Sequence, residues 1–522
     1  MDETDETAGS GRSGSEVVPH KTRRPHRKSR YGCTKCKVRR IKCDERAPRC
    51  SRCEKLNLVC VYRKKKDADG GTDPSGLSWS ELEQTLPPTE LDLFKHYLEH
   101  TSRDRTVGDQ DRYALQVGIP NLAFQCKPLM RSVLALAAVC KCCDIINQHP
   151  PASCTESSRG EVIALLSRAH GYHLESMREI QATLHEPKNY NHILANAAMM
   201  GMYGSASHGA RIWLAKTAPS GDDRQLFGLM MPGNPQWLGL FRAVRLAYAG
   251  LLKNSPQSSP GSSSVDFGMQ YGYKTGPLVP VEEVRSFIVT SHPLGSILAA
   301  TVGSALARVN EKASKVQATH GASAELQACS TALAIFNDIV AKSLLAPSPP
   351  ASDASPRTPG HDHNPPLPVA DIGEEENDPV GRLAEISPWL RRYAASISSM
   401  VPSKLPRRVI MSFVHKVPSA YLNLIEDMTS LIDTGPPPAG GTVPVPVPSI
   451  AHQLAVEIFA NWLVLAILLD NVWWIGGIGA WELGRFVSVR RFPGWEACLW
   501  NRDRDWWPES MLEVSRQFDK HR

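Results

Sequence analysis

Six cysteines lie within 28 residues near the start of the chain, and lysine and arginine fill most of the gaps between them. Their spacing is C-x2-C-x6-C-x6-C-x2-C-x6-C, so one half, C-x2-C-x6-C, occurs twice with a six-residue bridge between the copies. A C-x2-C turn places two sulfurs on one metal ion, and the third cysteine of each half supplies a further thiolate. The pattern therefore predicts a structural zinc site. Its candidate ligands are Cys33, Cys36, Cys43, Cys50, Cys53 and Cys60.

The number of thiolates also predicts how many ions are held and how they share ligands. Two tetrahedral zinc ions need eight ligand positions, yet the motif offers six thiolates, so two sulfurs must each bind both ions. The near-symmetry of the two halves favours the opening cysteine of each, Cys33 and Cys50, as the bridging ligands. The other two cysteines of each half would then complete one ion each. The expected cofactor is two Zn2+ ions.

The segment around these cysteines has few apolar side chains and many cations. Six thiolates with two Zn2+ carry a net charge of about −2, which the neighbouring lysines and arginines help to offset. A module this small cannot bury a large apolar core. Metal binding must therefore supply its folding free energy, on the order of 10 kcal/mol or more.

Charge is distributed unevenly along the 522 residues. The segment His20–Lys66 has 19 Lys+Arg against 3 Asp+Glu, a net charge of +16, whereas the whole chain carries +6, so the remainder sums to −10. This asymmetry indicates a polyanionic partner, and double-stranded DNA is the leading candidate. The basic arm before the cysteines suits both a nuclear import signal and a phosphate-binding segment, and it predicts a nuclear location. Its cations are Lys21, Arg23, Arg24, Arg27, Lys28 and Arg30.

The six-cysteine pattern resembles that of the fungal binuclear zinc-cluster transcription factors. The likeness is carried by the whole pattern, by "KVRRIK" between the second and third cysteines, by "CDE" at Cys43–Glu45 and by Pro48 in the bridge. Two further stretches, Thr89–Arg103 and Asp470–Arg485, look like parts of the regulatory domains of these factors, including the sterol-responsive branch. For the body, the resemblance implies a helical domain that governs activation, dimerisation or ligand response.

The resemblance also implies which side chains meet DNA. In this family the first short helix enters the major groove, and its basic residues read a CGG triplet. Those roles carry over to Arg39 and Arg40, with Lys37 and Lys42 on phosphates. Lys37 and Arg40 stand where many members have arginine and lysine, respectively, and either side chain can donate to guanine O6 and N7.

Beyond the cysteines the apolar residues recur at helical spacing, and sustained strand-like alternation is scarce. Pro128 is expected to open a buried helix, and Ser158 with Glu161 reads as a capping box that begins another. Further helices are expected near 190–206, 236–252, 295–316, 322–345, 380–400, 419–432 and 451–472. The predicted fold class is mostly α, with a small N-terminal zinc-cluster module, a large all-helical regulatory domain and Pro/Ser-rich loop insertions.

Composition shifts divide the chain into four parts. Low-complexity, proline-rich or serine-rich stretches cannot bury enough surface to offset their ordering entropy, so we expect exposed, disordered loops there. The predicted organisation is a disordered leader at 1–19, the basic arm and zinc-cluster DNA-binding domain at 20–66, a linker at 67–86, and a helical regulatory domain at 87–522 with loops near 255–264, 346–370 and 435–449.

Several other classes of protein are disfavoured. The apolar run Ile458–Leu469 spans 12 residues between Glu457 and Asp470, short of the roughly 18 to 20 that a spanning helix needs, so no membrane span is expected. The N-terminus lacks the cationic start and apolar run of a secretory signal. No phosphate-cradling glycine loop, nucleophile elbow or metalloprotease motif occurs, so an enzyme is not expected.

The end of the chain is rich in tryptophan, with 8 of 12 within the last 61 residues. An ordinary core explains them best, while an apolar ligand pocket or a coregulator groove is the alternative. Cys140, Cys142 and Cys143 lie in an apolar helical stretch and are expected to be buried thiols.

The leading hypothesis is a nuclear, sequence-specific regulator of transcription by RNA polymerase II, whose zinc module reads CGG-type half-sites and whose helical body regulates its activity. Its partners would be double-stranded DNA, coregulators, a second copy through the helical domain and an apolar small molecule. One alternative is a metabolite-binding sensor or enzyme tethered to nucleic acid by the zinc module. A scaffold whose zinc module never reads bases is the other.

Overall fold

The computed structural model divides the chain into two compact units, Met1–Gly71 and Thr72–Arg522. All regular structure among the described residues is helical, which confirms the predicted mostly-α class. The basic arm, most of the linker and nearly all of the three expected loops lie outside the described residues, apart from 447–449 at the end of the third loop. The structure describes residues 33–39, 41, 43–44, 50–56, 86–103, 109–182, 189–218, 236–253, 281–345, 385–401, 403, 405–434, 447–488, 490, 495–501 and 505–520.

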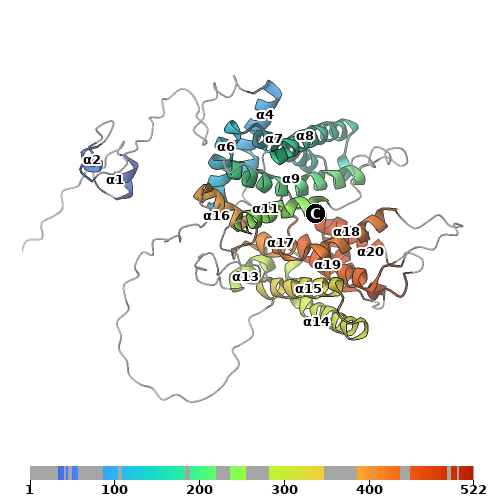
Figure 1. The fold of residues 1–522 in the computed structure, drawn as a ribbon. Coiled ribbons are helices and arrows are strands. Elements are labelled where there is room, and N and C mark those ends of the chain that lie inside the picture. The colour runs from blue at the N-terminus through green and yellow to red at the C-terminus, as the bar shows by residue number, and fades with distance from the viewer. Residues whose placement is uncertain are drawn as a thin grey trace, which may run out of the picture. The chain divides into compact units, whose positions relative to one another are not determined.

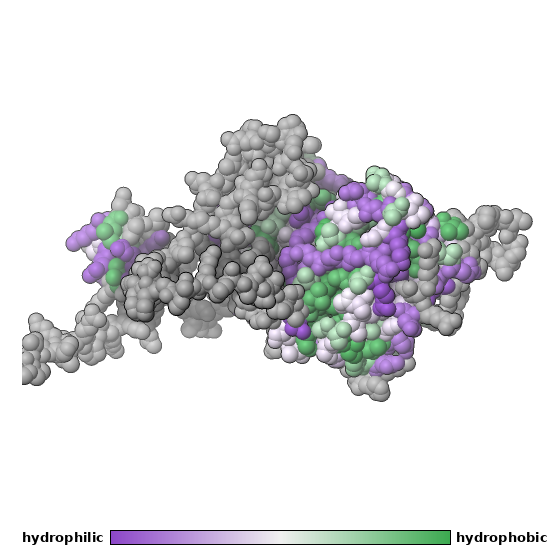
Figure 2. All heavy atoms as spheres, turned by 90° about the horizontal axis from the view of Figure 1, so that it is seen from below, coloured by the Kyte–Doolittle hydropathy of each residue, from purple (hydrophilic) through white to green (hydrophobic). Residues whose placement is uncertain are grey.

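Among its described residues, the first unit contains two short helices, α1 (Thr34–Val38) and α2 (Ser51–Lys55), one in each half of the cysteine motif. Its buried cluster among described residues consists of cysteines, with Ile41 packed against them. In Figure 2 the described atoms of this unit show mostly hydrophilic surface. The module has the small apolar core that its sequence predicts.

The second unit holds a first apolar core built by the helices of its N-terminal part (Figure 1). The apolar helix α7 is buried along most of its length and packs between α8 and α9. These helices are α4 (Pro88–Glu99), α6 (Ile119–Gln125), α7 (Lys127–Gln148), α8 (Glu156–Ala182) and α9 (Tyr190–Lys216), joined from later in the chain by α16 (Pro388–Ile397). The short segments η1 (Thr101–Arg103), α5 (Asp109–Tyr113), η2 (Ala114–Gly118) and η3 (Pro151–Ser153) connect or flank them.

A second core is assembled around α19 (Ile450–Ile467), whose side chains are nearly all buried. Its remaining elements are α13 (Val281–Ser291), α14 (Gly295–His320), α15 (Ala324–Ser343), α17 (Pro406–Lys416), α18 (Ser419–Thr434), α20 (Ile478–Ser488), η7 (Leu499–Asn501) and α21 (Trp507–Lys520). The helix α11 (Gln236–Lys253) lies between the two cores and supplies residues to both. On the face in Figure 2, the hydrophobic residues of the body lie in separate patches between hydrophilic ones.

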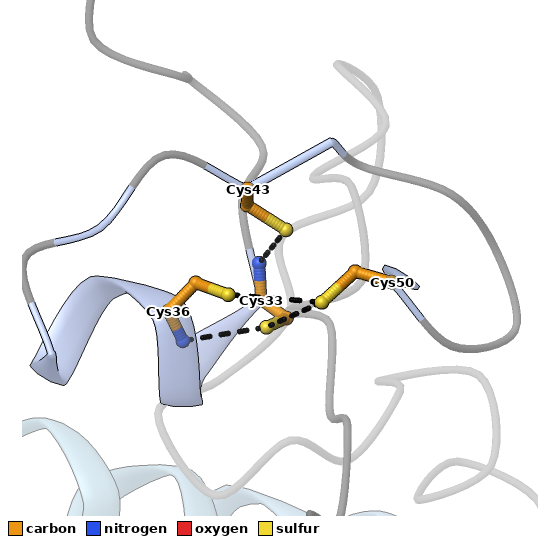
Figure 3. Close-up of side chains that lie close together, drawn as sticks. All are labelled: Cys33, Cys36, Cys43 and Cys50. Carbon is orange, nitrogen blue, oxygen red and sulfur yellow. Dashed lines mark hydrogen bonds between the residues drawn. The ribbon is translucent and has the colours of Figure 1, made fainter. Parts of the chain in front are cut away.

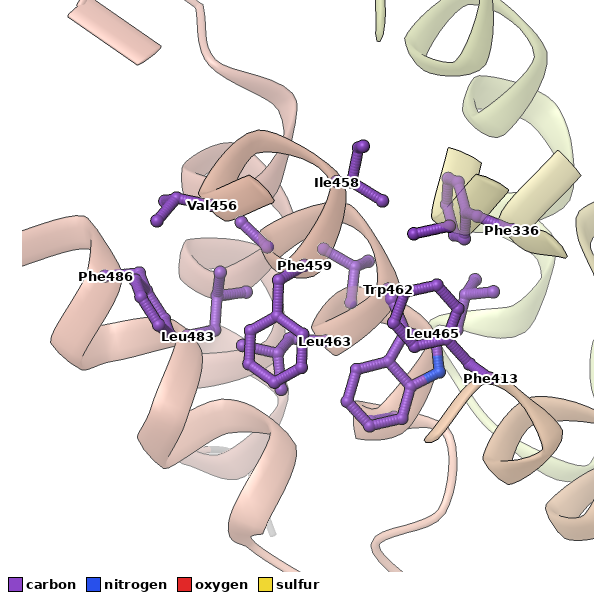
Figure 4. Close-up of a cluster of buried hydrophobic side chains, with 14 of the residues drawn as sticks. Phe336, Phe413, Val456, Ile458, Phe459, Trp462, Leu463, Leu465, Leu483 and Phe486 are labelled. Carbon is purple, nitrogen blue, oxygen red and sulfur yellow. The ribbon is translucent and has the colours of Figure 1, made fainter. Parts of the chain in front are cut away.

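The C-terminal tryptophans are largely part of this second core. Trp462 is completely buried, stacks on Phe413 with ring centroids 5.2 Å apart, and donates from Nε1 to the carbonyl oxygen of Ile410 at 3.0 Å (Figure 4). Trp495, Trp500 and Trp506 are also almost fully buried. The core explanation therefore holds for these four side chains.

The helix α19 is long and apolar enough to cross a membrane by length and composition, but 83% of it is buried inside the body. It also carries Glu457, which is 2% exposed and binds Lys312 at 2.9 Å and Trp506 Nε1 at 3.1 Å. Such a helix is typical of the centre of a large helical core.

One local expectation was wrong. The helix α8 begins at Glu156, and its first turn is capped by a reciprocal pair in which Thr155 Oγ1 accepts from the Ser158 amide and Ser158 Oγ accepts from the Thr155 amide, each at 3.1 Å. Ser158 is therefore inside the helix and not the residue that caps it. Thr155 takes the capping position because its hydroxyl reaches the free amide three residues on.

Replacing Trp462 by alanine removes a completely buried ring and a hydrogen bond, so we expect the free energy of unfolding to fall by about 3–5 kcal/mol. Urea unfolding of the full chain, followed by circular dichroism, measures the loss. The control is Phe287→Ala, because Phe287 is 59% exposed and its removal should change stability little. A loss below about 1 kcal/mol for Trp462→Ala would contradict this account of the core.

Candidate metal centre and nucleic-acid interface

Each half of the cysteine motif begins a short helix in the same way. Cys33 caps α1, and its sulfur accepts from the backbone amide of Cys36 at 3.4 Å. Cys50 caps α2, and its sulfur accepts from the amide of Cys53 at the same distance. The repeated C-x2-C spacing therefore gives repeated local structure, in which the opening sulfur occupies the helix cap.

The sulfurs of the two halves converge on one small region (Figure 3). Cys33 Sγ lies 3.8 Å from Cys50 Sγ and 3.6 Å from Cys53 Sγ, and Cys36 Sγ lies 3.6 Å from Cys50 Sγ. The sulfurs of Cys33, Cys36, Cys43 and Cys50 all lie within 4.8 Å of one another. Cys33, Cys36, Cys43, Cys50 and Cys53 are at most 3% exposed, while Cys60 lies outside the described residues.

The sulfur spacing fits zinc. A tetrahedral ion with Zn–S bonds of about 2.3 Å places its ligand sulfurs about 3.8 Å apart. The three distances between 3.6 and 3.8 Å match that edge, and a disulfide would require sulfurs about 2 Å apart. Buried thiols that approach one another this closely without bonding are suited to a thiophilic metal ion.

The local electrostatics make one thiol easier to ionise than another. The pKa of Cys50 is lowered to about 6, chiefly because the Cys53 amide donates to its sulfur. Burial raises the pKa of the Cys36 thiol well above its usual value. Because a metal binds the thiolate, ion uptake must release protons from sulfurs such as that of Cys36, whose pKa is raised.

Asp44 joins the first half of the motif to the second. Its carboxylate accepts from the Ser51 amide at 3.1 Å and also from the Ser51 hydroxyl, so it adds to the cap that Cys50 provides at the start of α2. A carboxylate at a helix N-terminus is favoured by the free amides and by the helix dipole. This contact gives a structural role to the aspartate of the "CDE" stretch.

The described cations of the module are exposed, although the sulfurs are buried. Lys37 lies on α1 and Arg39 ends that helix, and both side chains face solvent. Lys35, Arg52 and Lys55 are exposed as well. Arg40, Lys42 and the six cations of the basic arm lie outside the described residues. The structure therefore places exposed positive charge on the same short helix that Cys33, a candidate metal ligand, caps.

The structure brings together one further group that the sequence did not single out. His96 of α4 lies beside Cys140 and Asp144 of α7, with their ligand atoms within 4.8 Å of one another. His96 Nε2 and an oxygen of Asp144 are 2.8 Å apart, which is a direct hydrogen bond. The i, i+4 spacing of Cys140 and Asp144 was the one sign of this group in the sequence. It could not reveal the third member, because His96 lies on a separate helix. Cys140 and Cys142 are buried, as expected, while Cys143 is half-buried.

Comparison with known proteins assigns the module. Residues 31–69 match the model of the fungal Zn(2)-Cys(6) binuclear cluster domain. The chain carries this domain. A domain of this family binds two zinc ions, which agrees with the cofactor expected from the thiolate count.

The relatives with curated names include fungal proteins named as Zn(2)-C6 fungal-type transcription factors. The chain is 37% identical over 123 residues to the Zn(2)-C6 fungal-type transcription factor afumD of Aspergillus fumigatus. This match covers 22% of this chain and 33% of the relative. The chain is 45% identical over 62 residues to sterol uptake control protein 2 of Candida albicans. This match covers 10% of this chain and 9% of the relative. A Zn(2)-C6 fungal-type transcription factor of Gibberella zeae is 58% identical over 40 residues, 8% of each chain.

These matches span a third or less of each relative's length. No solved structure matches the chain. The comparisons therefore identify the zinc-cluster domain and do not assign an activity to the helical body.

Replacing Asp44 by alanine removes its hydrogen bonds to Ser51 at the start of α2, so we expect the module to lose about 1 kcal/mol of stability and its zinc affinity to fall about fivefold. Competition for zinc with a chelator measures the change. Asp44→Asn is the matched control, because an asparagine oxygen can cap the helix equally well. Equal zinc retention by Asp44→Ala and the unmodified protein would show that the cap does not support the metal site.

Proposed function

We propose that this protein is a nuclear, sequence-specific DNA-binding regulator of transcription by RNA polymerase II. The observation that carries the proposal is the convergence of buried thiols, at the spacing of zinc ligands, directly beside exposed Lys37 on α1 and Arg39 at its end. The metal fixes a short cationic helix that a peptide of this size could not hold by apolar packing. The relatives' printed names as transcription factors support the same class of function.

Within the module, Cys33 and Cys50 are the proposed bridging ligands. The sulfur of Cys33 approaches Cys53 of the other half at 3.6 Å, and that of Cys50 approaches Cys36 at 3.6 Å. Each opening cysteine is thus close to a terminal ligand of both ions in the two-ion scheme. Cys43 would complete the first ion, and Cys60 the second.

On DNA, the proposed readers of a CGG-type half-site are Arg39 and Arg40, with Lys37 and Lys42 on phosphates. Arginine can donate two parallel hydrogen bonds to guanine O6 and N7, which gives sequence discrimination. Lysines on phosphates and the cations of the basic arm would add affinity that falls as salt rises. The net charge of +16 over His20–Lys66 supports such salt-sensitive phosphate binding.

The helical body is proposed to regulate the module through a ligand, a coregulator or association with a second copy. Its two large cores show a folded domain and not a passive tail. A scaffold that binds DNA without reading bases remains the competing function, and duplex selectivity separates the two.

Arg39→Ala is expected to weaken discrimination between a CGG-containing duplex and a scrambled duplex by about 1–3 kcal/mol, because it removes base contacts. Lys37→Ala should instead weaken binding to both duplexes and lower the salt slope by about one unit. Lys55→Ala is the control, because Lys55 is an exposed cation on α2. Fluorescence anisotropy with the full chain at several salt concentrations measures both effects. Equal affinity of the unmodified protein for the two duplexes at physiological salt would favour the scaffold.

Zinc analysis of the full chain tests the shared-ligand scheme separately. Two ions per chain are expected to be held by the six cysteines, and replacing the proposed bridge Cys50 by serine should release both. Replacing Cys53, a terminal ligand, should chiefly weaken one ion. One zinc per unmodified chain would overturn the bridging scheme.

A further inference from the structure

A second group of metal-ligand side chains lies in the helical body, where α4 packs against the buried helix α7. His96 comes from α4, and Cys140 and Asp144 come from α7. One ligand atom from each of the three lies within 4.8 Å of the other two. Metal sites of helical proteins are commonly built in this way, from side chains on facing helices.

The spacing along α7 explains why two of these side chains meet. Cys140 and Asp144 are four residues apart, so they project from the same face of the helix, one turn from each other. His96 approaches that face from α4, and its Nε2 is 2.8 Å from an oxygen of Asp144. One helix therefore supplies two members of the group, and the packing of a second helix supplies the third.

The group lies at the edge of the first core. Cys140 is 7% exposed, while the side chain of His96 is 12% exposed and that of Asp144 is 46% exposed. An ion could reach the group from the side of the carboxylate, and the sulfur would then hold it away from bulk water.

The donor set suits zinc better than a hard cation. Zinc binds thiolate sulfur, imidazole nitrogen and carboxylate oxygen, whereas Mg2+ and Ca2+ take oxygen ligands. A thiolate and a carboxylate together carry two negative charges, which a divalent ion neutralises. Tetrahedral zinc places a nitrogen and an oxygen ligand about 3.4 Å apart, so the contact between His96 and Asp144 would widen by about 0.6 Å on binding.

The His96 ring is able to make that adjustment. Its Nδ1 has no hydrogen-bond partner among the residues that the structure describes, so the ring is oriented by one hydrogen bond, to Asp144. His100, four residues further along, is exposed and has its ring centroid 4.8 Å from that of His96. This second imidazole is a further donor for the fourth position of a tetrahedral ion.

We propose that His96, Cys140 and Asp144 bind a structural Zn2+ ion that ties α4 to α7, with His100 or water in the fourth position. Among the described residues, α4 is the first helix of the body. A bound ion would therefore join the beginning of the body to its first core by coordinate bonds as well as by apolar packing. This inference concerns the body alone and is independent of whether the zinc module reads DNA.

The test is the thermal midpoint of the full chain as buffered free Zn2+ rises from a level that already fills the zinc module. Tryptophan fluorescence reports the body alone, because none of the 12 tryptophans lies in Met1–Gly71. Zinc should raise the midpoint in a saturable way, by about 2–4 °C at about 100 times its dissociation constant, because an ion that binds only the folded state stabilises it. Mg2+ at the same concentrations should have no effect.

Cys140→Ala should lower the apparent affinity of the body for zinc by about tenfold or more, because it removes the sulfur ligand. The same change leaves the atoms of the His96–Asp144 hydrogen bond in place, so it separates a metal site from an ordinary hydrogen bond. Asp144→Asn keeps the shape but removes the charge, so it should also weaken zinc binding, and it covers the case in which Cys140→Ala does not fold. Cys154→Ala is the matched control and should leave the response unchanged, because Cys154 lies between η3 and α8 and is not part of the group.

Metal analysis gives a second, independent readout. The unmodified chain should hold one more zinc ion than Cys140→Ala, whatever number the zinc module itself holds. No saturable rise with zinc, an equal rise in Cys140→Ala, or equal zinc content of the two proteins would each overturn the proposal. An equal rise with Mg2+ would show a general effect of divalent cations and would also contradict a thiolate site.

Discussion

The convergence of cysteine sulfurs is the interaction on which the N-terminal module depends. Among the described residues its buried cluster consists of five cysteines with Ile41 packed against them, so the apolar burial seen there does little to hold α1 and α2 together. Sulfurs 3.6 to 3.8 Å apart are close to the edge of a zinc–thiolate tetrahedron. The free energy of metal binding therefore supplies the folding free energy of the module, and it fixes the positions of the exposed cations on α1.

The helical body is held by a different force. Two apolar cores meet along α11, and α19 fills the second with a nearly continuous apolar surface. Charged groups at the seam, among them Asp111 and Arg408, are buried and paired across segments that are far apart in the chain. Loss of one partner of a buried ion pair leaves an uncompensated buried charge, which lowers stability strongly. Polar as well as apolar contacts therefore fix how the two cores pack together.

The zinc-cluster domain was predictable because its cysteines are close in sequence. A C-x2-C turn fixes two sulfurs through local geometry, and the duplicated half implies how the second set meets the first. The long helices followed from their period, as with the buried helix opened at Pro128. By contrast, the start of α8 was misassigned because Thr155 and Ser158 can both cap a helix, and only the fold shows which one does so.

The buried ion pairs of the helical body could not have been inferred in this way. Asp111 lies beside Arg407 and Arg408, nearly 300 positions later, and α17 itself is a short helix whose pattern was not recognised. Tertiary contacts between such distant segments leave no local period or spacing in the sequence. Arg40, Lys42 and Cys60 stay predictions, since they lie outside the described residues.

The most direct test of the central claim is duplex selectivity of the full chain before and after removal of zinc. With the metal bound, the protein should prefer a CGG-containing duplex over a scrambled one at physiological salt. Exhaustive chelation should abolish that preference and leave only weak, salt-sensitive binding, and added Zn2+ should restore it. Selectivity that survives complete loss of zinc would contradict the account.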